Sequence, residues 1–152
     1  MLNENLKLSG EVSLVLKDKD GNVKDQREIK NLVVNAGLAY IASRMVGTAK
    51  AVMSHMALGS NNTAAAAPQT DLQSILGSRE AIDTTTITGS NNEKVQYVCA
   101  FEAGDATGAI VEAGIFNAAS GGDMLCRTTF AVVNKAADDT MTVTWTITLS
   151  AV

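Results

Sequence analysis

The sequence predicts a mainly β protein, an antiparallel β-sandwich, and three stretches carry that prediction. Residues 140–149 alternate apolar and threonine side chains without a break, which is the period of a strand with one buried face. Residues 109–130 place two apolar runs around a loop rich in Gly, Asn and Ser, the pattern of a β-hairpin. Residues 6–16 alternate as well. The chain of 152 residues is long enough to bury a core, and we expect one β-rich domain over 1–152.

The chain opens with a second predicted hairpin. Leu6 to Leu16 is its first strand, and residues 17–22 contain an Asp-Gly turn signal. Residues 23–34 return as the other strand, charged at first and apolar at the end.

The hydrophobic period then changes from two to three and four. The apolar residues that share one helix face are Leu38, Ile41, Ala42 and Met45. We therefore expect a short helix over 36–46, with Asn35 as its N-cap and Gly47 as its C-cap.

The middle of the chain is predicted to contain three strands and a second, shorter helix. Residues 52–58 form an apolar run that favours a buried strand. A threonine three residues before a glutamine has the spacing of a capping box, which predicts a helix of one or two turns near 70–76. Residues 78–88 and 94–102 are predicted strands separated by a Gly-Ser-Asn-Asn turn.

Composition and charge exclude several partner classes. The net charge is −4 and Lys and Arg form no run, so we expect neither a nucleic-acid partner nor a membrane partner. No stretch has the length or apolarity of a membrane span or the apolar core of a secretory signal. The two cysteines, Cys99 and Cys126, lie inside predicted strands, and we expect buried free thiols of a protein made in a reducing cytoplasm.

The residues that carry catalytic or metal chemistry are sparse. The only histidine, His55, lies in an apolar strand far from both cysteines, so no metal site, no cofactor and no catalytic triad is predicted. Residues 18–22 faintly resemble a calcium loop, but a hairpin turn explains them. Glu102 and Glu112 fall on adjacent predicted strands, and a carboxylate pair for glycoside hydrolysis is an alternative. The clefts and aromatic platforms for a sugar are missing, so we expect no enzyme.

Glu112 is the unusual member of the 109–130 hairpin, because it is a carboxylate inside an otherwise apolar strand. We predict that it is a structural carboxylate. It is expected to accept hydrogen bonds from backbone N–H groups, or to pair with a basic residue such as Arg127 or Arg79.

The last strand carries a row of polar, uncharged side chains opposite its apolar face. A solvated face is one interpretation, and a packing face in an oligomer is the other, since uncharged rows suit flat contacts between subunits. We call this row the threonine face, and it consists of Thr140, Thr142, Thr144, Thr146 and Thr148.

Three segments give the chain a resemblance to small structural proteins of tailed bacteriophages. One is VMSHMALG at residues 52–59 with the loop through Thr70-Asp71-Leu72. The second is VEAGIFN at residues 111–117, followed after a glycine turn by MLCR at 124–127. The third is NLVVNAG at residues 31–37. Tail-fibre and tail-collar proteins carry similar segments, and the resemblance extends from about residue 30 to the end.

The resemblance implies a non-enzymatic virion component, synthesised and assembled in the host cytoplasm. Fibres of this kind usually continue into a long shaft, whereas this chain ends at Val152, so a stand-alone module is expected. Its expected partners are copies of itself, a trimer being favoured, and other phage tail or capsid proteins. A tail-associated short fibre, collar or adaptor is preferred. A capsid decoration (cement) protein is the alternative, and a receptor- or glycan-binding module is a further one.

Overall fold

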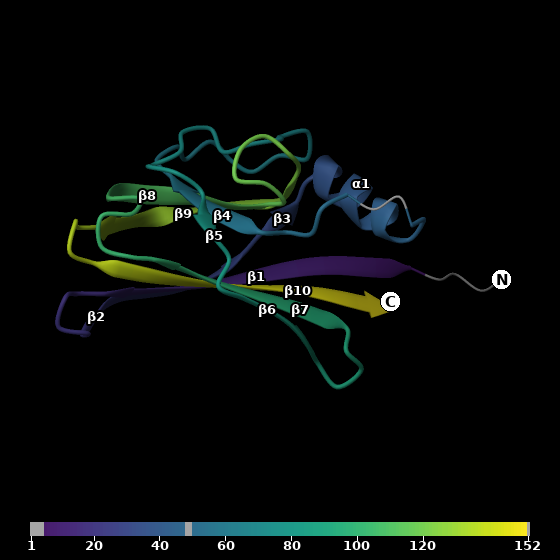
Figure 1. Ribbon diagram of the computed structural model, residues 1–152, viewed down its shortest axis with the longest axis horizontal. Helices are drawn as coiled ribbons and strands as arrows, with labels where there is room; N and C mark the ends of the chain where they lie inside the picture. The colour runs from purple at the N-terminus through teal and green to yellow at the C-terminus, as the bar shows by residue number, and fades with distance from the viewer. Residues whose placement is uncertain (1–4, 48–49, 152) are drawn as a thin grey trace.

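Two antiparallel sheets of five strands each pack face to face as a sandwich with one short helix (Figure 1). The computed structural model describes residues 5–47 and 50–151. Sheet A has the strand order β2-β1-β10-β7-β6, and sheet B has the order β3-β9-β8-β4-β5. The elements are β1 Leu6–Lys17, β2 Val23–Lys30, β3 Leu32–Val33, α1 Asn35–Arg44, β4 His55–Gly59, β5 Glu80–Ala81, β6 Thr84–Thr88, β7 Lys94–Phe101, β8 Gly108–Phe116, β9 Met124–Lys135 and β10 Thr140–Ala151.

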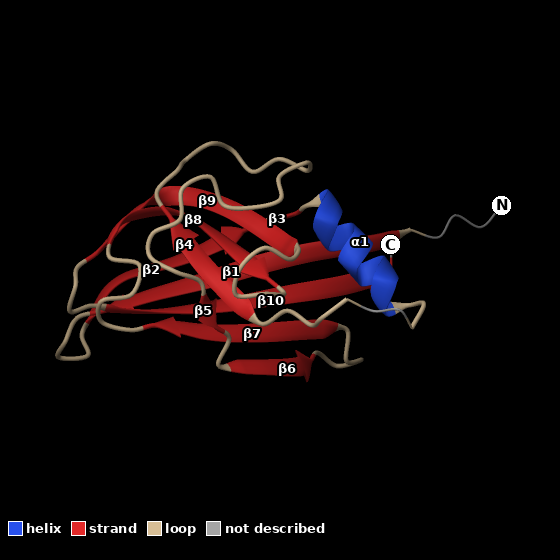
Figure 2. Cartoon of the chain, turned by 45° about the horizontal axis from the view of Figure 1, so that its top comes forward, coloured by secondary structure: helices blue, strands red, loops and turns tan. Residues whose placement is uncertain are grey.

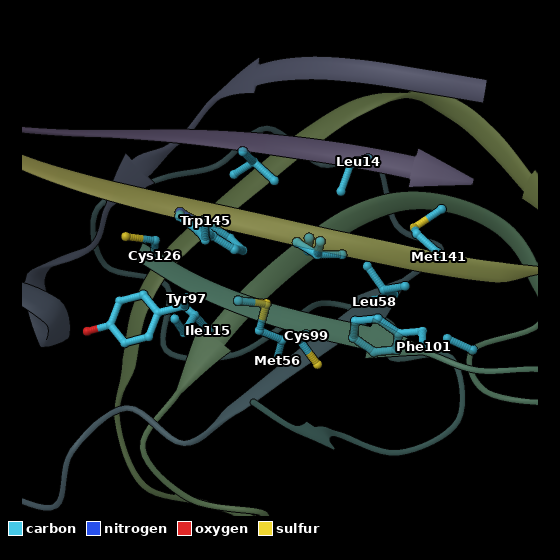
Figure 3. Packing of buried hydrophobic residues seen from close by; sticks show 14 of the residues in the cluster. Leu14, Met56, Leu58, Tyr97, Cys99, Phe101, Ile115, Cys126, Met141 and Trp145 are labelled. Carbon is cyan, nitrogen blue, oxygen red and sulfur yellow. The ribbon is translucent and has the colours of Figure 1, made fainter. Parts of the chain in front are cut away.

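The main core lies between the sheets, where alternate residues of the long strands meet. Trp145 of β10, fully buried, is the largest of these side chains. Leu14 reaches the core from β1, and Ile115 reaches it from β8 in the opposite sheet (Figure 3). Burial of this apolar surface drives the two sheets together, because each buried aliphatic or aromatic side chain contributes about 1.5–3 kcal/mol.

The two clearest sequence patterns form the centres of the two sheets. β10 lies between β1 and β7 in sheet A, and its apolar residues from Met141 to Ile147 are buried as the alternation predicts. The β8–β9 hairpin pairs antiparallel inside sheet B. The predicted β-sandwich with a short helix after the first hairpin is therefore confirmed.

The second predicted strand, residues 23–34, is divided between the two sheets. β2 pairs with β1 in sheet A, whereas β3 pairs with β9 in sheet B. Asn31 lies at the crossing, and its Oδ1 accepts a hydrogen bond of 3.2 Å from Trp145 Nε1. Residues 78–88 divide in the same way, because β5 pairs with β4 in sheet B and β6 pairs with β7 in sheet A. Alternation indicates a strand but not the sheet to which it belongs.

Helix α1 begins one residue earlier than predicted and is capped differently. Val34 is the N-cap and makes no side-chain cap, while the backbone N of Asn35, the predicted cap, donates to Ala67 O. Met45, not Gly47, is the C-cap. The helix is fixed by close packing on β9, where a Cβ on Gly37 would collide with the carbonyl of Leu125. No helix within residues 5–47 and 50–151 has the length and apolarity that a membrane crossing requires.

The helix predicted near 70–76 is not formed. This segment is an irregular loop that makes one isolated bridge, from Ile75 to Gly59. The amides of Gln73 and Ser74 donate to the carboxylate of Glu112, and Ser74 O accepts from Ser60 N. The Glu112 carboxylate, distant in the chain, thus accepts the Gln73 amide that the capping box would have satisfied locally.

Both cysteines are buried free thiols. Burial raises the pKa of Cys99 to about 12 and raises the pKa of Cys126 as well. The thiolate, which is the reactive form, is therefore scarce at neutral pH.

We expect neither thiol to react with a disulfide-exchange reagent at pH 8 in the native protein, and both to react in denaturant. An exposed Ser90→Cys variant in the 89–92 turn is the matched control and should add one rapidly reacting thiol. Rapid labelling of the wild-type protein without denaturant would contradict the described packing.

Candidate functional site

The threonine face lies on the outer side of sheet A, opposite the core. Its members on β10 are half-buried among neighbouring strands. Thr144 lies between Ser13 of β1 and Val98 of β7, and Thr142 lies between Val15 and Ala100. The centre of this surface is therefore uncharged.

Charged residues lie toward β2 and the ends of the threonine face. Glu11 lies opposite Thr146 and Lys17 opposite Thr140 on β1, and Lys94 lies opposite Thr148 on β7. Helix α1 and the long loops are drawn on the side of sheet B, and the lower side of sheet A is left open (Figure 1). An open, weakly charged sheet face framed by charge is a suitable contact surface.

The second notable feature is a buried ion pair on the outer side of sheet B. Glu112 of β8 and Arg127 of β9 are both fully buried. Glu112 Oε2 accepts from Arg127 Nη2 at 2.8 Å and from Nε at 3.0 Å. This is one of the two basic partners that the sequence predicts for Glu112. Arg79, the other, stacks over the Phe116 ring at 3.6 Å instead.

The pair ties the long loop of residues 60–79 to the sheet. Glu112 also accepts from the backbone N of Asn61, Gln73 and Ser74 at 3.3, 3.1 and 2.8 Å. Arg127 Nη1 donates to Thr63 O at 2.8 Å and to Gln69 Oε1 at 3.0 Å. The loop covers a second apolar cluster, which consists of Val34, Ala57, Leu72, Phe116 and Met124. Both charges are thus satisfied, as buried charges must be.

Gly59 leaves room for this ion pair. It lies opposite Glu112 in the β4–β8 ladder, and a Cβ there would collide with Glu112 Oε1 and the carbonyl of Ser74. A glycine is required because the carboxylate and the loop approach the strand closely.

We expect Gly59→Ala to lower the free energy of unfolding by about 1–3 kcal/mol, because the added methyl displaces the carboxylate or the loop. Denaturant unfolding measures the change. An unchanged midpoint would mean that the space above Gly59 is open.

The structure does not bring together the residues that the catalytic alternatives require. Glu102 follows β7 in sheet A and is exposed, whereas Glu112 is buried in sheet B, so the expectation of adjacent strands is wrong. His55 Nδ1 lies 2.8 Å from Ser54 Oγ, and no carboxylate among the described residues hydrogen-bonds to this imidazole. A triad needs both contacts.

No group of three or more potential metal ligands occurs in the described part of the chain. Residues 18–22, which resemble a calcium loop, form the β1–β2 turn. Asp18 Oδ1 accepts from the backbone N of Asp20 and of Asn22, both at 2.9 Å, as in an Asx turn.

An apolar cavity of about 160 Å³ lies between the sheets beside α1. Its walls include Tyr40, Leu125 and Ile147. Tyr97 also lines it, and burial raises the pKa of that phenol to about 12, so the phenol is neutral at physiological pH. A binding or catalytic pocket normally combines such apolar walls with a few polar groups that converge on the ligand.

Comparisons with known proteins give no relative: no family model, no curated protein and no solved structure matches the chain. The function must therefore be inferred from the residues and their geometry. The sequence singled out Glu112 and the threonine face, but not the contacts of Arg127 with the 60–79 loop. The one feature of the sequence that could have indicated these contacts was an arginine inside the second apolar strand of the same hairpin.

Proposed function

We propose that this chain is a non-enzymatic structural component of a tailed bacteriophage virion. In this proposal it is a tail-associated short fibre, collar or adaptor, assembled in the host cytoplasm, that docks on other virion proteins. The observation that carries the proposal is the threonine face, a mostly uncharged sheet surface that no element within residues 5–47 and 50–151 covers (Figure 1). The phage-like segments at 52–59 and 111–117 supply the biological setting.

The docking mechanism is shape complementarity on a rigid surface. β10 is paired on both sides along its length, by β1 and by β7, so the threonine face loses little conformational freedom on binding. Short hydroxyl side chains also lose little rotamer entropy on contact. The charges around the face then select the orientation of the neighbouring protein.

The alternatives within the virion differ in location rather than in mechanism. A capsid decoration protein would use the same face on the head instead of the tail. A trimer, which the resemblance favours, would bring copies together around the neighbouring protein. A glycan-binding module is less well supported, because Trp145 is fully buried and Tyr40 and Tyr97 are each 7% exposed, which leaves none of these rings free to stack on a sugar.

The test measures incorporation into particles. Phage lacking the gene for this chain is grown in cells that supply wild-type protein, Thr144→Lys or Ala64→Lys, and the chain is quantified in purified particles. Thr144→Lys places a charge at the centre of the threonine face and should lower incorporation at least about tenfold. Ala64→Lys, in the exposed part of the 60–79 loop, is the matched control and should behave as wild type.

Two results would count against the proposal. Equal incorporation of Thr144→Lys and Ala64→Lys removes the threonine face as the docking surface. Absence of the wild-type chain from purified particles removes the virion assignment itself.

A further inference from the structure

In the described part of the chain, four strands stand at the ends of the two sheet orders, and of these four β6 is the one without a protecting feature. β3 and β5 are two residues long, and short edges pair poorly. β2 is long but carries five charged side chains in eight residues. β6 has five residues, TTTIT, without charge, proline or bulge, and four of them are exposed.

An edge strand directs half of its backbone N–H and C=O groups away from the sheet. Proteins usually block such edges with charge, proline, bulges or a covering segment. β6 forms the outermost strand of sheet A beyond β7, with no element drawn across its free side (Figure 2). Its free edge is thus suited to pair with another strand.

We propose that β6 pairs antiparallel with β6 of a second copy of this chain, about a two-fold axis at Thr86. This inference goes beyond the proposed function, and it names the edge where two copies meet. A two-fold contact closes on itself, so the isolated chain forms a dimer. Any trimer in a virion would require a different surface.

The sequence of β6 is complementary to itself in this register. Thr86 lies opposite Thr86 of the second copy, and Thr84 opposite Thr88. Thr85 lies opposite Ile87, which is 59% exposed in the single chain and becomes covered. Threonine and β-branched pairs are favourable cross-strand neighbours.

The same register separates Asp83 from its own symmetry mate. Asp83, which precedes β6 and accepts a hydrogen bond of 2.7 Å from Ala100 N, falls opposite Gly89 of the second copy. A register centred on Thr85 would instead place Asp83 opposite Ile87, which combines a carboxylate with an aliphatic side chain. Burial therefore favours Thr86 over Thr85 as the centre, although Asp83 then approaches the Glu93 carboxylate that lies beside Gly89 of the second copy.

Pairing would also join the contact surfaces of the two copies. Thr84 lies opposite Val98 and Thr86 opposite Gln96, the β7 residues that pair with Thr144 and Thr146 of the threonine face. The outer threonines of β6 thus belong to the same side of sheet A. Two copies paired at β6 present one continuous sheet with a threonine face in each half.

The test uses the purified chain alone, so its failure leaves docking on the virion through the threonine face standing. Sedimentation velocity is recorded from about 10 to 500 µM, since a contact of five residues per copy lies at the weak end of interface sizes. The expected result is a concentration-dependent dimer. A monomer throughout this range overturns the proposal.

Charge variants test the register. Thr86→Lys and Thr86→Glu each place like charges opposite one another and should raise the dissociation constant at least about tenfold. An equimolar mixture of the two should restore the dimer, because opposite charges then meet. Gln26→Lys, at an exposed position of β2 on the opposite edge of the sheet, is the control and should dimerise as wild type. A dimer unaffected by Thr86→Lys, or one that the mixture fails to restore, contradicts the register.

Cross-linking provides a second measurement that keeps the side chain uncharged. Thr86→Cys should form a covalent dimer under mild oxidation, because directly opposed residues lie within disulfide distance. Thr88→Cys should not, because the two copies of residue 88 lie four residues apart along the ladder. The native thiols are buried and do not interfere. Equal cross-linking of both variants would reject the Thr86 axis.

Discussion

Replacing Glu112 with glutamine is expected to lower the free energy of unfolding by about 3–5 kcal/mol, because it leaves Arg127 as an uncompensated buried charge. Arg127 is fully buried and donates two charge-assisted hydrogen bonds to Glu112 Oε2. The carboxylate also accepts three backbone amides, which an amide oxygen alone cannot satisfy. Urea unfolding followed by far-UV circular dichroism measures the change.

Two further measurements locate the effect at the 60–79 loop. Hydrogen exchange of the Gln73 and Ser74 amides should accelerate more in Glu112→Gln than exchange in the β1–β10 ladder, because the loop loses its anchor first. The double variant Glu112→Gln/Arg127→Met should cost less than the sum of the two single changes, with a coupling of about 0.5–3 kcal/mol.

Glu28→Gln is the matched control for this prediction. Glu28 is an exposed glutamate of β2, and its replacement should change stability by less than about 0.5 kcal/mol. A loss below about 1 kcal/mol in Glu112→Gln would mean that the ion pair is solvated, which contradicts the buried arrangement described above.

Truncating Trp145 to alanine should destabilise the sandwich by about 3–5 kcal/mol, since it removes the largest fully buried side chain and leaves a cavity. The ring lies between the two sheets, and its Nε1 satisfies Asn31 Oδ1 at the crossing between β2 and β3. For a domain of this size the change corresponds to roughly 6–20 °C in melting temperature.

Trp145→Phe separates packing from hydrogen bonding. It keeps an aromatic ring but leaves Asn31 Oδ1 without its donor, which should cost about 1–3 kcal/mol. Leu38→Ala on α1, where the side chain is 51% exposed, is the control and should change stability by less than about 0.5 kcal/mol. If Trp145→Ala melted within a degree or two of wild type, Trp145 would not be the centre of the core.

Features that depend on residues close together in the chain could be predicted from the sequence. The unbroken threonine alternation placed β10, and the glycine-rich loop placed the β8–β9 hairpin. An unpaired carboxylate in an apolar strand required a partner, and Arg127 in the other strand of the hairpin was one of the two named. Each of these inferences uses residues that are close in the chain or share one strand period.

The failures share a different cause, which is competition from distant residues. The capping box at 70–76 predicts a helix locally, but Glu112, far along the chain, accepts the amides of Gln73 and Ser74. Asn35 has the side chain of an N-cap, yet its backbone is held by Ala67 O. Residues 23–34 and 78–88 read as single strands because a period of two does not show where a strand passes from one sheet to the other.

The fold suggests how stability and assembly are divided in this chain. Sheet B carries the buried ion pair and the 60–79 loop on its outer side, so that side is closed. Sheet A keeps an open outer side, with the threonine face at its centre and β6 at its free edge. The proposed contacts with virion partners and with a second copy therefore both lie on sheet A, whose outer side no other element of the described chain covers.

The most direct test of the proposed virion assignment is immunogold electron microscopy of the phage particles that are proposed to contain this chain, with antibodies against the purified protein and with particles lacking the gene as control. The account predicts gold on the tail. Gold confined to the head would favour the decoration alternative over the tail module, and particles without any label above the control would contradict the assignment to the virion.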